Sequence, residues 1–90
     1  MRAGETNGDA TALALAALGW TVSDANRAHR LLDMTGLTPT DLRARAGEAS
    51  VLAAVLGFLE AYEPDLVACA EAIGAQPAAL VAARAKLEMA

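Results

Sequence analysis

The sequence predicts an all-α protein, a compact bundle of five to six short helices. Aromatic residues make up only 3% of the chain, and β-branched residues are also few, which leaves little of the material that sheets favour. Alanine and leucine, which are strong helix formers, are abundant. Apolar residues recur at helical spacing between glycine and proline breaks. Ninety residues make one domain with a modest core, which we place over 9–90.

The first helix is expected over 10–21, because residues 10–20 carry no charge. A helix that is apolar on all sides belongs inside a fold. Asp9 is placed to cap its first turn. Residues 1–8 contain two glycines, an asparagine and a threonine, with nothing to bury, and are predicted to form a disordered N-terminal arm.

The second and third helices are expected to form a corner. Apolar residues and a threonine at 28, 31, 32 and 35 share one helical face. Ser23 is a candidate cap for the second helix, and Gly36 suits its left-handed end. The third helix starts with Thr38 as cap, Pro39 as first residue and Asp41 as the acid of a capping box, and ends by residue 47.

Three further helices follow. The fourth is predicted over 48–62 and is as apolar as the first. The fifth begins near Pro64 and ends at Gly74, and the sixth begins at Pro77. Leu66, Cys69, Ala70 and Ile73 form one apolar face, and Leu80, Ala83, Arg84 and Leu87 form another, with the head of Arg84 expected in water.

The chain aligns with itself without a gap when it is shifted by 38 residues. Leu-Gly-aromatic and Gly-x-x-Pro-x-x-Leu recur at predicted helix ends, with Trp20 matching Phe58 and Gly36 matching Gly74. This repeat predicts two pseudo-symmetric three-helix halves, 10–47 and 48–85. In this arrangement the two apolar helices pack together on a pseudo-twofold axis.

The two halves differ in charge. Arg27, Arg30, Arg43 and Arg45 lie in the first half, whereas residues 46–83 contain no basic residue. Because surfaces carry recognition, this asymmetry makes the four arginines candidate partner-binding residues. The leading hypothesis is a non-catalytic helical interaction module, an adaptor or small regulator that binds another protein or itself.

No residue pattern predicts catalysis, a cofactor or a metal site. His29 is the only histidine, and Cys69 is the only cysteine and lies on an apolar helix face. The net charge of −4 disfavours nucleic acid and anionic membranes. No apolar run reaches the ~18 residues of a transmembrane helix. A single cysteine and a polar N-terminus fit the cytoplasm.

Two alternatives remain open. Residues 30–45 are similar to a helix-turn-helix, with arginines on the second helix, so the chain could be a DNA-binding regulator. Leu32 and Thr35 depart from that pattern, and the same turn recurs in the acidic half, which favours a generic helix corner. The other alternative is a small-molecule pocket between the halves, beside Trp20 and Phe58.

From Leu13 to Leu87 the chain resembles a short bacterial family known only as a domain of unknown function. The segments that carry the resemblance are Ala-Leu-Gly-Trp at 17–20, Arg-Ala-His-Arg-Leu-Leu at 27–32, Thr-Gly-Leu-Thr-Pro-Thr-Asp-Leu-Arg-Ala-Arg-Ala at 35–46 and Val-Leu-Gly-Phe-Leu at 55–59. The resemblance implies a small helical bacterial protein. It supplies no activity and no functional residues.

Overall fold

The computed structural model describes the backbone of residues 3–90 and the side chains of residues 9–90. Across this range the chain is helical and contains no strand, which confirms the all-α prediction. The helices are α1 (Ala3–Val22), α2 (Ala25–Thr35), α3 (Pro39–Arg45), α4 (Ala49–Glu60), α5 (Glu63–Ile73) and α6 (Pro77–Glu88).

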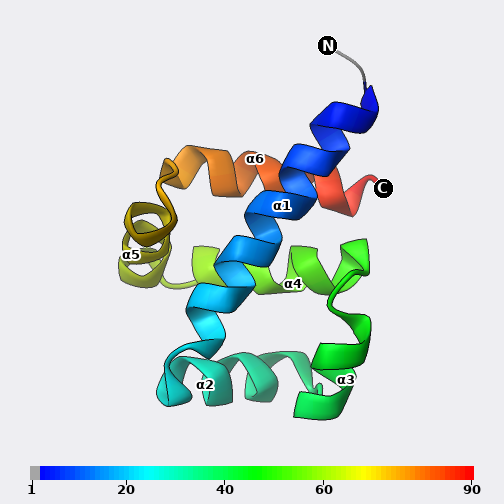
Figure 1. The fold of residues 1–90 in the computed structure, drawn as a ribbon. Coiled ribbons are helices and arrows are strands. Elements are labelled where there is room, and N and C mark those ends of the chain that lie inside the picture. The colour runs from blue at the N-terminus through cyan, green and yellow to red at the C-terminus, as the bar shows by residue number, and fades with distance from the viewer. Residues whose placement is uncertain (1–2) are drawn as a thin grey trace.

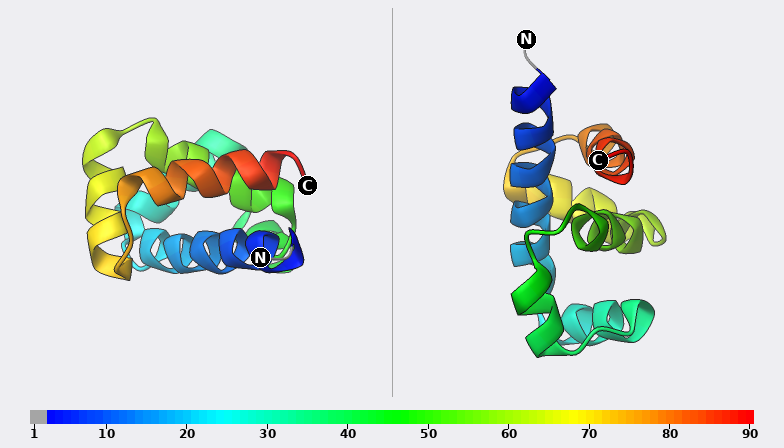
Figure 2. Two further views of the ribbon diagram at one scale, coloured as in Figure 1. Left: turned by 90° about the horizontal axis from the view of Figure 1, so that it is seen from above. Right: turned by 90° about the vertical axis from the view of Figure 1, so that its right-hand side faces the viewer.

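Three helices are stacked and a fourth crosses them (Figures 1 and 2). Helices α6, α4 and α2 lie one below another, and α1 runs across the stack on one face. Helix α5 joins α4 to α6 at one end of the stack, and α3 joins α2 to α4 at the opposite end. The closest packing is among α1, α4 and α6.

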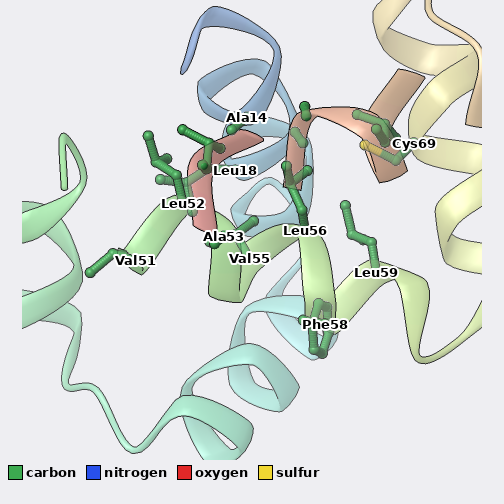
Figure 3. Packing of buried hydrophobic residues seen from close by; sticks show 14 of the residues in the cluster. Ala14, Leu18, Val51, Leu52, Ala53, Val55, Leu56, Phe58, Leu59 and Cys69 are labelled. Carbon is green, nitrogen blue, oxygen red and sulfur yellow. The ribbon is translucent and has the colours of Figure 1, made fainter. Parts of the chain in front are cut away.

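The core is built around α4. Seven of its twelve residues are buried, on more than one side of the helix: Val51, Leu52, Ala53, Val55, Leu56, Phe58 and Leu59. In Figure 3, Leu52 lies beside Leu18 of α1, Leu56 and Leu59 lie on the side of Cys69 of α5, and Phe58 points away from both. The prediction that this apolar segment lies inside the fold is confirmed, because a helix without a polar face must be covered by neighbours.

The corner formed by α2 and α3 is attached by little apolar surface. Leu31 is the only buried residue of α2, and Leu42 is the only buried residue of α3. Helix α2 packs on α1 and, to a smaller extent, on α4. The corner is therefore the part of the fold with the least apolar burial.

Helix α1 begins earlier than predicted. The backbone is helical from Ala3, so Asp9 lies within the helix and is not its N-cap. Residues 3–8 of the predicted arm follow the helix, and residues 1–2 lie outside the described part; the disorder of the arm stays a prediction. Extending a helix adds one hydrogen bond per residue fixed, whereas starting one is costly, so a packed helix can grow past weak helix formers.

The hydrogen bonds at two helix starts test the predicted N-caps. The capping box of α3 is confirmed, since the Thr38 hydroxyl accepts from the Asp41 amide at 3.0 Å. The predicted cap of α2 is wrong by one residue. Asp24 accepts from the Arg27 amide at 3.0 Å, whereas the Ser23 hydroxyl donates to the Trp20 carbonyl at the end of α1.

Two helix ends match across the predicted repeat. Gly36 and Gly74 both end a helix with φ of 75°, and Pro39 and Pro77 both open the next helix. The predicted pseudo-twofold packing is not shown. Helix α6 packs along both α1 and α4, whereas its counterpart α3 makes no comparable contact with either. The matching glycines and prolines therefore set similar local turns, while the predicted pseudo-symmetric halves stay a prediction.

We expect opposite stability effects from alanine at two glycines. Gly74→Ala should lower the free energy of unfolding by about 1–2 kcal/mol, because a side chain is strained at a positive φ. Gly19→Ala should raise it by about 0.5–1 kcal/mol, because Gly19 is helical with nothing within 4 Å of an added Cβ. Urea denaturation of both variants provides the measurement, and equal effects would contradict this assignment.

Candidate functional site

The four arginines predicted to bind a partner do not converge on one site. Arg27 is half-buried, and its guanidinium carbon lies 3.7 Å from the centre of the Trp20 ring. It also donates to the Trp20 carbonyl at 2.7 Å. This cation therefore sits at the C-terminal end of α1, where free carbonyls and the helix dipole favour positive charge.

Arg30 connects the two halves of the chain. Its guanidinium donates to the Asp65 carboxylate at 3.1 Å, joining α2 to the first turn of α5. The same group lies 5.6 Å from the Phe58 ring centre and 6.0 Å from that of Tyr62. In the structure, Arg30 therefore links two helices that are far apart in the sequence.

The other two arginines lie on α3. Arg45 pairs with Glu48 at 3.0 Å across the short link to α4, and both side chains are about half exposed. Arg43 is exposed and forms no ion pair with any side chain in the range 9–90 that the structure describes. Of the four predicted residues, Arg27 and Arg43 have no carboxylate partner for the guanidinium in that range, but Arg27 is engaged by Trp20 and Ser23, whereas Arg43 has no such contact there.

Arg84 departs from its prediction in a similar way. Its guanidinium was expected in water, but it forms ion pairs with Glu60 of α4 and with Glu88 one turn further along α6. The second of these pairs has an N–O distance of 2.8 Å. The cation fastens α6 to α4, so it too serves the fold.

Arg43 lies at an apolar groove of about 610 Å³ that residues of α1, α2 and α3 line. We name this the α1–α2–α3 groove. Its lining consists of Leu15, Leu18, Gly19, Val22, Ala25, Ala28, His29, Leu32, Pro39, Leu42, Arg43 and Ala46. Leu15 and Val22 are 42% and 44% exposed. The lining contains no carboxylate, and its only side chains able to carry positive charge are Arg43 and His29.

The groove follows from how α1 is covered. The α4–α6 body contacts one side of α1, which leaves Leu15 and Val22, seven residues apart, on an uncovered side. The weakly packed α2–α3 corner then supplies the walls, with Leu42 and His29 among them. Sequence reasoning placed the whole apolar segment inside the fold and missed this site. The sequence does carry one signal for this groove: the apolar surface of residues 10–20 extends around the whole helix, which is wider than a single neighbouring layer can cover.

A second cleft of about 750 Å³ lies between the end of α2, α4 and the end of α6. Phe58 lines it, but Trp20 does not, so it matches only half of the predicted small-molecule pocket between the halves. Its charged residues Arg45 and Glu88 are already paired within the chain. The cleft offers no unpaired charge among the described residues to select a ligand.

The reactive residue types lie apart from one another. His29 is exposed in the α1–α2–α3 groove, whereas Cys69 is fully buried on α5, as predicted. Burial raises the pKa of the Cys69 thiol to about 11, which disfavours the reactive thiolate. Within the described residues, no three His, Cys, Asp or Glu side chains are arranged to hold a metal ion.

None of the described helices is by itself long and apolar enough to cross a membrane. Helices α5 and α6 reach the required length and composition only together, and the chain bends by 99° between them.

The described chain is a small all-α protein with an apolar groove among α1, α2 and α3. The chain belongs to the family described as "Protein of unknown function (DUF3572)", which it matches over residues 7–90. This confirms the resemblance to an uncharacterised helical family. No curated protein matches the chain, and no solved structure matches it.

The raised pKa of Cys69 predicts a loss of stability in alkali. Below pH 9 the thiol is protonated in both folded and unfolded chains; between about pH 9 and 11 only the unfolded chain loses the proton, so stability falls. The loss should approach about 2–3 kcal/mol. Denaturation of wild type and Cys69→Ala across this range isolates it, because other groups titrate alike in both. Parallel pH curves would contradict the prediction.

The different roles of the arginines predict different stability effects. Arg27→Ala should lower the free energy of unfolding by about 1–2 kcal/mol, because it removes the contact with Trp20 and a hydrogen bond to a helix-end carbonyl. Arg43→Ala should change it by less than about 0.5 kcal/mol. Thermal melts of the two variants test this, and a larger loss for Arg43→Ala would overturn the assignment.

Proposed function

We propose that the protein is a non-catalytic helical module that binds a helix of a protein partner in the α1–α2–α3 groove. The observation that carries this proposal is the exposure of Leu15 and Val22 over an apolar groove of about 610 Å³. Contiguous exposed apolar surface marks interaction sites, and grooves of this kind accept the apolar face of an amphipathic helix. The module acts as an adaptor or small regulator.

The chemistry of the groove supports binding rather than catalysis. Its polar side chains are His29 and Arg43, on different helices, and its lining includes no carboxylate, thiol or hydroxyl. A catalytic site needs a nucleophile or an acid and base held in mutual reach. An apolar lining with a few polar groups at its edge is instead the composition of a recognition site.

DNA binding through the α2–α3 corner has less support. Arg30 and Arg45 are each paired with a carboxylate, while affinity for DNA depends on several cations that contact phosphates. In a helix-turn-helix the first residues of the second helix meet the bases. Here Asp41 occupies that region and is engaged in a capping box.

We also place the module in the bacterial cytoplasm. A free cysteine suits a reducing compartment, and the sequence resemblance is to a bacterial family.

The proposal predicts position-dependent crosslinking in the producing cell. A photoreactive benzoylphenylalanine at position 22, in the groove, should form a covalent adduct with a partner protein. The same residue at position 85, which is exposed on α6 outside the groove, is the matched control and should not. Leu15→Glu, introduced together with the position-22 probe, should remove the adduct, because a charge cannot enter an apolar contact without cost.

Gel shift and mass spectrometry identify the adducts. Absence of an adduct at position 22, or equal yields at positions 22 and 85, together with a monomer at high concentration by sedimentation, would refute the proposal.

A further inference from the structure

We infer that the partner segment is an amphipathic helix with an acidic residue beside its apolar stripe, and that its carboxylate pairs with Arg43. This inference rests on the proposed function, since it specifies what occupies the α1–α2–α3 groove. It goes further by naming the secondary structure of the ligand and the sign of its charge.

The charge of the occupant follows from what surrounds Arg43. Arg30, Arg45 and Arg84 each contact a carboxylate of this chain, whereas Arg43 contacts none among the described side chains. The groove lining includes no carboxylate that could serve instead. His29, which lines the groove from α2, adds a further hydrogen-bonding group and no negative charge. A guanidinium at the edge of an apolar groove is complementary to a carboxylate, which it can bind through two parallel hydrogen bonds.

The secondary structure of the occupant follows from the shape and composition of the groove. A peptide added as a strand needs an open sheet edge, and the described chain contains no strand. A proline-rich segment docks on aromatic walls, and no aromatic residue lines this groove. Leu15 and Val22 instead expose apolar surface two helical turns apart, with Leu18 below. That spacing matches apolar anchors at i, i+3 or i+4, and i+7 of a partner helix.

A second copy of this chain fits the groove less well. Helix α5 carries Glu63, Val67 and Glu71 on an exposed side, so it has the required sign of charge. Val67 is the only large apolar residue exposed on α5, whereas the groove has room for several anchors. Such a contact joins two different surfaces, so it would close as a dimer only if each copy docked its α5 into the other's groove, and it would otherwise form a ring or an open chain.

The test uses two synthetic alanine-rich peptides of about 20 residues, longer than the ~12–15 residues below which an isolated helix is marginal in water, with leucines at i, i+4, i+7 and i+11. One carries glutamates on both flanks of the leucine stripe, and the other carries lysines at the same positions. Binding is measured by fluorescence anisotropy. Wild type should bind the glutamate peptide about fivefold more tightly than the lysine peptide, the scale of an exposed ion pair.

Charge reversal makes the test specific to the site. Arg43→Glu should invert the preference, so that the lysine peptide binds more tightly. Lys86→Glu changes the net charge equally, but Lys86 lies on α6 and does not line the groove, so this variant should keep the wild-type preference. Val22→Glu should weaken both peptides by about tenfold or more. Far-UV circular dichroism of each variant verifies that the fold is retained.

The outcomes separate this inference from the proposed function. Binding that depends on Val22 but shows no charge preference, or equal effects of Arg43→Glu and Lys86→Glu, overturns the acidic partner and leaves the groove as a docking site. Failure of both peptides to bind, or binding that Val22→Glu leaves unchanged, overturns both. Self-association that Leu15→Glu abolishes assigns the groove to a second copy and overturns this inference.

Discussion

The burial of α4 is the constraint on which the rest of the structure depends. This helix has apolar residues on several sides, with seven of its twelve residues buried, and no arrangement of a single neighbour could cover it. Helices α1 and α6 pack against it, and α5 closes one end of the stack. Burying a leucine contributes roughly 1.5–3 kcal/mol, and Leu52, Leu56 and Leu59 of α4 are all inaccessible to solvent. The neighbouring helices are therefore arranged so that they cover the apolar sides of α4.

The groove is a consequence of how the helices cover α4. Helix α1 also lacks a polar face over residues 10–20, but the α4–α6 body covers only one of its sides. The remaining apolar side, marked by Leu15 and Val22, faces a corner held by one buried residue in each of its two helices. Uncovered apolar surface has a cost in water, and a fold retains it most readily where a partner supplies the missing cover. The link from sequence to proposed function therefore runs through incomplete burial rather than through a reactive side chain.

Electrostatics then decides which side chains are available to that partner. The chain places most of its arginines where they support its own helices: Arg27 on Trp20, Arg30 on Asp65, Arg84 on Glu60. Each of these contacts joins two helices, and the arginine that makes it is no longer available to bind a ligand. Arg43 is the exception among the four arginines of the first half, and its place beside the groove is the basis for the acidic partner that we infer.

The sequence by itself determined the features that depend on neighbours along the chain. Gly36, Gly74, Pro39 and the Thr38–Asp41 capping box mark helix ends, and these signals work within one turn of backbone. The apolar runs likewise identified the core helices. Only the tertiary structure decided which side of α1 stays uncovered, that Arg30 reaches Asp65, and that α3 and α6 differ in packing despite matching sequences. Those outcomes depend on which helices far apart in the sequence pack against the same apolar face. Packing in three dimensions determines this, and a local sequence pattern does not predict it.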